Sequence, residues 1–166
     1  MRRWIIAAIV LSCSTLVGAK ELAEFTQSME HQSGFFDIYY DGKSGKVYLQ
    51  VDKLEQPFIF LNSLPQGVGS NDIGLDRGQL GETRIVQFER YGDKVMLKQL
   101  NTYYRANSNN AAERESIDEA FADSVIAGFT VAAEDDNSVL VDYTSFLLSD
   151  VHQMSETLSN RKQGNY

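Results

Sequence analysis

The chain has 166 residues, of which 43% are hydrophobic, and it contains nine Phe and eight Tyr. This length is typical of a single domain and the apolar content is enough for one packed core, so disorder of the whole chain is excluded. The formal net charge is -8, from 15 basic and 23 acidic residues. Nucleic acid is therefore not an expected partner, because phosphate binding requires a basic surface.

The first 19 residues have the features of a secretory signal peptide. Two arginines precede an apolar stretch that starts at Trp4, and the small residues Val17-Gly18-Ala19 predict cleavage after Ala19. The exported chain would be periplasmic or secreted. A membrane anchor is the alternative, but a span needs about 20 consecutive apolar residues, and hydroxyl side chains interrupt this shorter segment.

A second alternative for the N-terminus is a lipid anchor. The string Val10-Leu11-Ser12-Cys13 loosely resembles a bacterial lipoprotein box, which would make Cys13 the lipidated residue. Cleavage after Ala19 would instead remove the only cysteine. The mature chain would then have no disulfide, no cysteine nucleophile and no thiolate metal site.

Residues 20–33 predict a flexible or weakly helical lead-in, because mainly polar residues there separate few apolar ones. The domain itself is expected to cover residues 34–166. It begins with a β-hairpin, in which the runs 36–40 and 46–51 are joined by the glycine-containing turn 41–45. In the neighbouring pair Phe35-Phe36, one ring is expected to face the core and the other the outside.

A short apolar run, residues 58–61, follows Pro57 and predicts a strand that is buried on both faces; a buried helical turn is the alternative. Residues 84–90 and 94–100 flank Tyr91-Gly92-Asp93 and predict a second hairpin with a charged outer face. Residues 130–133 and 138–142 predict a third pair of strands around an acidic turn. These hairpins imply an antiparallel sheet.

The clearest helix is expected after Asn110, where four residues recur at helical spacing on one face: Ile117, Phe121, Val125 and Gly128. A final short helix is expected to begin at Thr144 or Ser145 and to run through His152, with an extension to Leu158 left open. The predicted fold class is α+β, an antiparallel sheet of hairpins with one main packed helix and a short C-terminal helix.

A loop rich in glycine, residues 64–81 (the glycine loop), separates the short apolar run from the second hairpin. Long ordered loops usually have a function, and Asp76, Arg77 and Gln79 are our candidate contacts to a ligand or partner. The alternative is structural, with Asp76 accepting backbone N–H bonds and Arg77 covering the loop. The loop lacks the later glycine and the Gly-Lys-Ser/Thr string of nucleotide-binding loops.

The sequence contains no recognisable catalytic or metal-binding pattern. Its two histidines, His31 and His152, are far apart, whereas a helical zinc site needs two imidazoles one turn apart. Ser70 lacks the Gly-x-Ser-x-Gly frame of hydrolases, and the Ser-x-x-Lys match at residues 159–162 lies in a polar tail and is interpreted as accidental. The acidic run 134–137 lacks the ligand spacing of a calcium loop and is interpreted as a solvated turn. We therefore predict no cofactor in this chain.

One string within the glycine loop closely resembles a known family: Ser70-Asn71-Asp72-Ile73-Gly74-Leu75-Asp76-Arg77-Gly78-Gln79-Leu80-Gly81. Similar pieces follow in the family's order at residues 100–106, 112–114, 121–125 and 141–150. Together they resemble the N-terminal, non-catalytic region of large secreted bacterial zinc-dependent metallopeptidases. The resemblance covers residues 34–166 and implies that the zinc and its His-Glu-x-x-His helix belong to a later, missing domain.

The resemblance implies an accessory domain that packs against this downstream peptidase domain, assists its folding or shapes access for a peptide substrate. The chain itself would then not be an enzyme but a fragment of one. Residues 163–166 look like the approach to a further strand, so we expect the chain to stop inside a domain. A self-standing periplasmic module that recognises a peptide or glycan is the alternative, and an independent hydrolase with unfamiliar residues is a third hypothesis.

Overall fold

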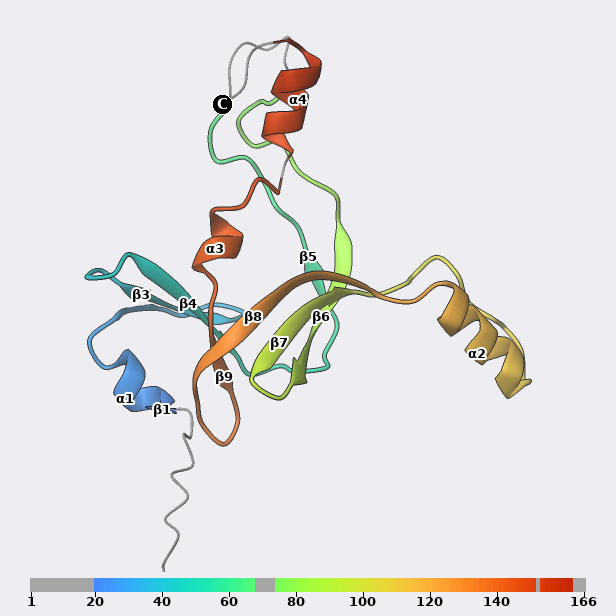
Figure 1. Ribbon diagram of the computed structural model, residues 1–166, viewed down its shortest axis with the longest axis horizontal. Helices are drawn as coiled ribbons and strands as arrows, with labels where there is room; N and C mark the ends of the chain where they lie inside the picture. The colour runs from blue at the N-terminus through green and yellow to red at the C-terminus, as the bar shows by residue number, and fades with distance from the viewer. Residues whose placement is uncertain (1–19, 68–73, 152, 163–166) are drawn as a thin grey trace, which may run out of the picture.

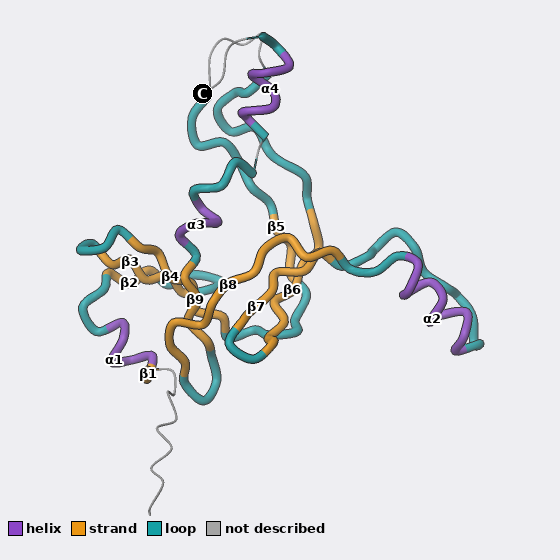
Figure 2. Tube along the Cα trace, viewed as in Figure 1, coloured by secondary structure: helices purple, strands orange, loops and turns teal. Residues whose placement is uncertain are grey.

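The computed structural model describes residues 20–67, 74–151 and 153–162 (Figure 1). Cys13 and Ala19, on which the two N-terminal predictions depend, lie outside the described residues, as do His152 and residues 163–166. The fold is α+β in the broad sense, with more strand than helix (Figure 2). No helix in the described part of the chain is long and apolar enough to cross a membrane.

The described residues form nine strands: β1 (Lys20–Glu21), β2 (Glu30–Gln32), β3 (Asp37–Asp41), β4 (Lys46–Val51), β5 (Phe58–Phe60), β6 (Arg84–Tyr91), β7 (Lys94–Gln99), β8 (Ser124–Glu134) and β9 (Val139–Asp142). They also form four short helices: α1 (Leu22–Thr26), α2 (Ala111–Ala120), α3 (Thr144–Leu147) and α4 (Met154–Asn160).

Eight of the strands make one antiparallel sheet in the order β2-β3-β4-β9-β8-β7-β6-β5, and β1 pairs in parallel with β8. The long strand β8 is shared between two halves of this sheet. Its first part pairs with β7 and its last part with β9, with a register shift in each pairing. The sheet curls along β8, and buried residues of β4 and β9 thereby pack against those of β6 and β7 (Figure 1).

The three hairpins predicted from the sequence are confirmed, and local turn chemistry explains each. In the β3–β4 turn, Asp41 accepts hydrogen bonds from the Lys43 N–H and the Ser44 hydroxyl, and Gly45 has φ +70°. Gly92 has φ +63° in the β6–β7 turn, a conformation that glycine adopts without a steric cost. In the β8–β9 turn, Asp135 Oδ1 accepts from the backbone N–H groups of Asn137 and Ser138. This acidic run is therefore a turn, as interpreted.

Alternation along the strands divides the apolar residues between two cores. Leu49 and Val51 of β4 face the space between the two halves of the sheet, whereas Tyr48 faces the other side. Phe88 of β6 lies in the centre of the main core, where its ring contacts those of Phe36, Phe58 and Phe129. Phe36 is half-buried in this core and Phe35 is exposed, as expected for that pair, although both lie in the bend before β3 and not in a strand.

The second core lies on the opposite face of the β4–β9 half and is covered by α1. Leu22 of α1 packs with Tyr48, Ala133 and Leu140, and Thr26 is buried beside it. This segment was expected to be a flexible or weakly helical lead-in, and residues 22–26 do form the short helix α1. The apolar residues of α1 cover the second core, and β2 pairs with β3 as a further strand of the sheet. Residues 20–33 are therefore part of the domain.

Strand β5 differs from the prediction of a strand buried on both faces. Phe58 and Phe60 turn inward, but Ile59 is 70% exposed. Phe58 and Phe60 pack on the main core, whereas Ile59 points to the outer face, where it belongs to no buried cluster. Strand β5 is also the last strand of the sheet order and pairs with β6 on one side. A continuous apolar run is thus an edge strand here.

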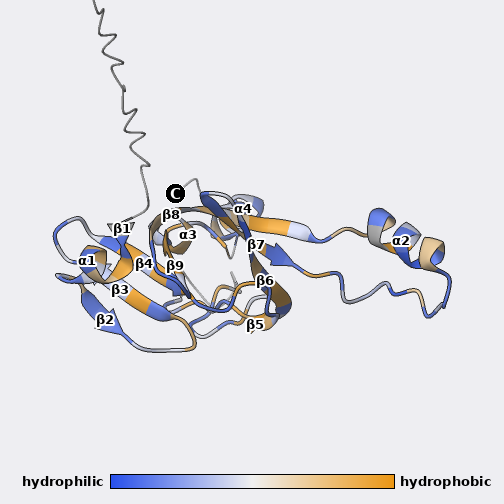
Figure 3. Ribbon diagram, turned by 90° about the horizontal axis from the view of Figure 1, so that it is seen from below, coloured by the Kyte–Doolittle hydropathy of each residue, from blue (hydrophilic) through white to orange (hydrophobic). Residues whose placement is uncertain are grey.

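The main helix, α2, is not packed on the sheet, which contradicts our prediction. It ends at Ala120, and Val125 and Gly128 belong to β8, so the four apolar residues at helical spacing do not share a helix. Five of the ten α2 residues are charged and most are exposed, so the helix has little apolar surface to bury. Residues 100–123, which we call the arm, carry α2 away from the sheet (Figures 1 and 3).

The C-terminal region contains two short helices in place of the single helix expected from Thr144. Helix α3 is anchored to β4, because the Thr144 hydroxyl accepts from the Val47 N–H at 2.9 Å. Helix α4 begins after Gln153, which has φ +53°. Leu158 of α4 packs with Leu64 and Leu75 of the glycine loop, forming a small separate cluster.

Candidate functional site

The glycine loop places the three predicted contact residues on the surface. Asp76, Arg77 and Gln79 are all exposed. The loop is held by its backbone, with the Gly78 N–H donating to the Leu64 carbonyl at 2.8 Å and the Leu64 N–H donating to the Gln79 carbonyl at 3.0 Å. Within the described residues, the side chains of Asp76 and Arg77 make no hydrogen bond or ion pair. They are therefore presented to solvent, and the structure does not gather them into a pocket.

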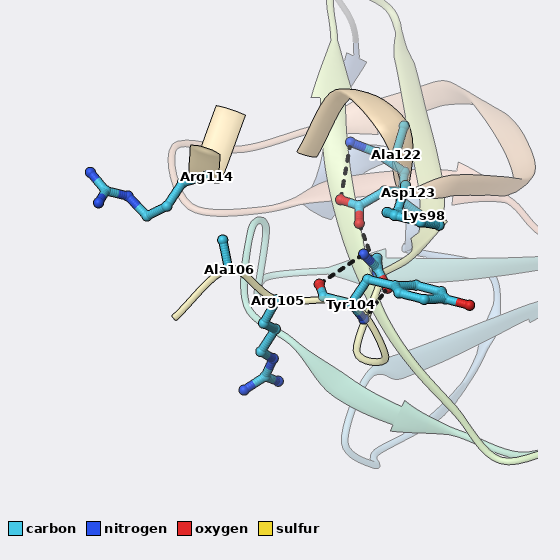
Figure 4. Close-up of a pocket in the computed structure, with 9 residues that line it drawn as sticks. Lys98, Tyr104, Arg105, Ala106, Arg114, Ala122 and Asp123 are labelled. Atoms are coloured by element: carbon cyan, nitrogen blue, oxygen red, sulfur yellow. Dashed lines mark hydrogen bonds and ion pairs between the residues drawn. The ribbon is translucent and has the colours of Figure 1, made fainter. Parts of the chain in front are cut away.

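A hollow of about 580 Å³ lies where the arm leaves the sheet (Figure 4). We call it the arm-base pocket. It is lined by Lys98, Asn101, Tyr104, Arg105, Ala106, Arg114, Phe121, Ala122 and Asp123.

Lys98 and Asp123 form the floor of the arm-base pocket, and Lys98 also belongs to a polar network on β6 and β7 that extends beyond the pocket lining. Lys98 Nζ lies 3.0 Å from both Glu89 carboxylate oxygens and 3.8 Å from Asp123 Oδ2. Glu89 also accepts from the Tyr91 hydroxyl at 2.5 Å and from the Gln87 amide at 2.6 Å. The Tyr91 hydrogen bond, followed by that of Lys98, lowers the pKa of Glu89, and Glu89 raises the pKa of Lys98. Both groups are thus held in their charged forms.

The two legs of the arm are joined at the pocket by Asn101 and Asp123. The Asn101 N–H donates to Asp123 Oδ1 at 2.8 Å, and Asn101 Oδ1 accepts from the N–H groups of Tyr103 and Tyr104. The Tyr104 and Phe121 rings stack face to face, with centroids 3.8 Å apart and planes 11° apart. These contacts fix the base of the arm as it leaves β7 and returns to β8.

Two arginines supply positive charge at the rim of the pocket. Arg114 Nη1 donates to the Ser108 carbonyl at 2.8 Å, and Arg105 is exposed. Figure 4 shows both guanidinium groups pointing outward from the Lys98–Asp123 floor. The two groups point in different directions and do not converge on one position in the pocket, so they contribute positive charge to the rim without forming a single anion site.

The structure groups no three His, Cys, Asp or Glu side chains for a metal ion within its described residues. His31 Nε2 lies 2.9 Å from Asp37 Oδ2, and the His31 ring stacks on Tyr39 with centroids 4.7 Å apart. The imidazole is therefore occupied by a local surface contact on β2.

We predict that the Glu89 network makes stability depend on pH. A carboxyl group with a lowered pKa stabilises the fold above its unfolded pKa, near 4.5, and that contribution is lost as the pH falls through the folded pKa. Replacing Glu89 with Gln should lower the free energy of unfolding by about 1 kcal/mol at pH 7 and by less at pH 3. Urea unfolding at the two pH values measures this. Glu30→Gln, exposed on β2, is the control, and an equal loss at both pH values would contradict the prediction.

Sequence reasoning did not find the arm-base pocket. It predicted a charged outer face on the second hairpin, and that face does hold Gln87, Glu89 and Lys98, with Gln87 and Lys98 directly opposite each other. It gave no sign that Asp123, the last residue of the arm, lies close to Lys98. The usable signal was the alternation in β6 and β7, which puts these polar groups on one face.

A family model described as "Domain of unknown function (DUF5117)" matches residues 78–166. This range is 89 residues (166 − 78 + 1), or more than half of the 166. It contains Gln79, the arm and its pocket, whereas Asp76 and Arg77 lie just before it. No curated protein and no solved structure matches the chain.

Proposed function

The chain belongs to the family of the DUF5117 domain, and on this premise we propose that it is a non-catalytic accessory domain of a secreted or periplasmic zinc-dependent metallopeptidase. The peptidase assignment rests on the resemblance carried by residues 70–81 and by the four downstream pieces. All four of those pieces lie inside the range that the family model matches. Zinc and catalysis would belong to the downstream domain.

The observation that carries an accessory role is an exposed apolar patch on α3 and the residues after it. We call it the α3 patch and define it as Leu147, Leu148 and Val151. All three are exposed, and Leu148 is 82% exposed. A hollow of about 360 Å³ lies beside them, lined in part by Phe129, Phe146 and Val151. Clustered apolar side chains next to a hollow are typical of a surface that another protein segment covers.

We propose that the downstream peptidase domain covers the α3 patch. Helix α3 lies on one of the segments that connect the sheet with the cluster of α4 and the glycine loop, and the legs of the glycine loop itself, from β5 and to β6, are the others (Figure 1). A domain bound there would contact both parts and hold them together. Asp76, Arg77 and Gln79 would remain at the surface of the glycine loop, where they could contact the same domain or its peptide substrate.

The coding sequence tests the peptidase assignment directly. We expect the reading frame to continue past Tyr166 into a region that encodes His-Glu-x-x-His. A stop codon directly after Tyr166 would refute the assignment and leave the chain as a separate module.

The second test addresses the α3 patch in the full-length parent. We expect Leu148→Asp to leave folding of this region intact, because the side chain is exposed, and to lower peptidase activity at least tenfold by weakening domain packing. Tyr103→Asp is the matched control, since Tyr103 is also exposed but lies on the arm, away from the α3 patch and the glycine loop. Equal activity of the Leu148 variant and the parent would rule out a role for the patch.

A self-standing module that binds a peptide or glycan is the second candidate. It is favoured by the arm-base pocket, whose stacked Tyr104 and Phe121 rings and two rim arginines could receive an extended ligand. Intact export of the 166-residue product without a downstream domain would support it.

A further inference from the structure

A third hollow lies inside the curled sheet and is distinct from the arm-base pocket and from the hollow beside the α3 patch. We call it the aromatic slot. It has a volume of about 360 Å³ and is lined by Gly34, Phe35, Phe36, Ile38, Leu49, Phe58, Phe60, Phe88, Leu97 and Tyr143. Six of these ten residues are aromatic. The volume falls at the small end of the range for ligand pockets.

The slot exists because the sheet curls without closing. Strand β5 ends the sheet order on one side, and β3 and β2 end it on the other. Side chains bridge the gap instead of hydrogen bonds, with the Phe36 ring 5.1 Å from that of Phe58 and the Phe35 ring 5.8 Å away. The main core thus opens to solvent next to an unpaired strand edge.

The walls and mouth of the slot carry no free charge. Lys53 lies at the mouth, over the Phe35 and Phe36 rings, but its ammonium binds Asp52 at 2.7 Å and the Phe35 carbonyl at 3.0 Å. Burial raises the pKa of Tyr143 to about 12, so this wall is neutral at physiological pH. A charged occupant would lose its hydration without gaining a partner, which restricts the slot to uncharged apolar groups.

The strand beside the slot has the geometry of a recognition edge. Phe58 and Phe60 line the slot, while Ile59 between them points away and is exposed. Within the described residues, β5 pairs with β6 alone. Its other edge therefore offers backbone donors and acceptors to an added strand, and alternate side chains of such a strand would enter the slot.

We infer that the aromatic slot and the free edge of β5 form a binding site for an extended, uncharged peptide segment that inserts one aromatic side chain between Phe58, Phe60 and Tyr143. A second copy of the chain is disfavoured as the occupant, because each copy carries a net charge of -8. The inference goes beyond the proposed function and holds whether or not a peptidase domain follows.

Binding of a blocked peptide tests the site. The probe is acetyl-Thr-Val-Phe-Val-Thr-amide, titrated into the chain by calorimetry and by amide NMR. We expect it to bind at least tenfold more tightly than the same peptide with Ala at its centre, and the amide shifts to be centred on Phe58–Phe60. Backbone N-methylation of the probe should abolish binding, because it removes the donors that pair with the strand edge.

Variants separate the slot from general apolar binding. Phe35 is 61% exposed, so Phe35→Ala should leave the melting temperature unchanged while weakening binding of the probe about tenfold. Phe121→Ala, on the arm, is the matched control and should not change it. Equal affinities for the Phe and Ala peptides, shifts away from β5, or equally tight binding of N-acetyl-phenylalanine amide alone would each overturn the inference.

Discussion

Replacing Phe88 with Ala is expected to lower the free energy of unfolding by about 3–5 kcal/mol. The side chain is only 2% exposed, and its ring lies 5.4 Å from Phe36, 5.5 Å from Phe58 and 6.2 Å from Phe129. These contacts join the two halves of the sheet, so the variant leaves a cavity at their junction. Domains of this kind are stable by only about 5–15 kcal/mol. Urea unfolding followed by circular dichroism measures the loss.

The arm supplies a matched control for this prediction. Phe121 is partly exposed, and its ring contact is the stack on Tyr104. Phe121→Ala should cost less than about 1.5 kcal/mol, the usual upper value for an aromatic pair. Similar losses for the two variants would mean that the sheet halves are not joined by the core described above.

The hairpins could be predicted from the sequence because their determinants are local. In the β3–β4 turn, Asp41 and Gly45 act within five residues of each other, and in the β6–β7 turn Gly92 is enough. Each turn brings two alternating strands together, and the pairing follows without knowledge of the rest of the chain. The α+β class and the antiparallel sheet could be predicted from the sequence for the same reason.

The position of an element in the sheet could not be predicted, because it depends on distant partners. The run 58–61 has the composition of a central strand, yet β5 is an edge strand. The helical spacing from Ile117 to Gly128 crosses from α2 into β8, and β8 is fixed by its pairing with β7 and β9. Tertiary pairing overrode the local pattern in both cases.

The candidate sites show the same difference between local and distant determinants. Asp76, Arg77 and Gln79 were found because the glycine loop is conspicuous in the sequence, and the structure does place them on the surface. The arm-base pocket needs Lys98 and Asp123, which are separated by the whole arm, and the aromatic slot needs β3 and β5 at opposite ends of the sheet order. No local motif connects residues that meet only through the curl of the sheet.

The second large expected effect concerns residues 20–33, which the sequence predicted to be a flexible or weakly helical lead-in outside the domain. Leu22 is 6% exposed and packs with Tyr48, Ala133 and Leu140. We expect Leu22→Ala to lower the free energy of unfolding by about 2–4 kcal/mol, because a buried leucine loses its contacts and leaves a cavity under α1. A flexible lead-in would give a loss near zero, so urea unfolding distinguishes the two descriptions.

Leu148→Ala is the matched control for this measurement, since it removes the same atoms from a side chain that is fully at the surface. Its expected effect is within about 0.5 kcal/mol of zero. Hydrogen exchange gives a local measurement. If α1 no longer packs on the second core, the amides of β9 around Leu140 should exchange faster in the Leu22 variant alone. If both variants unfold at the same urea concentration, α1 does not cover the outer face of β4 and β9, and the domain begins after residue 33 as the sequence suggested.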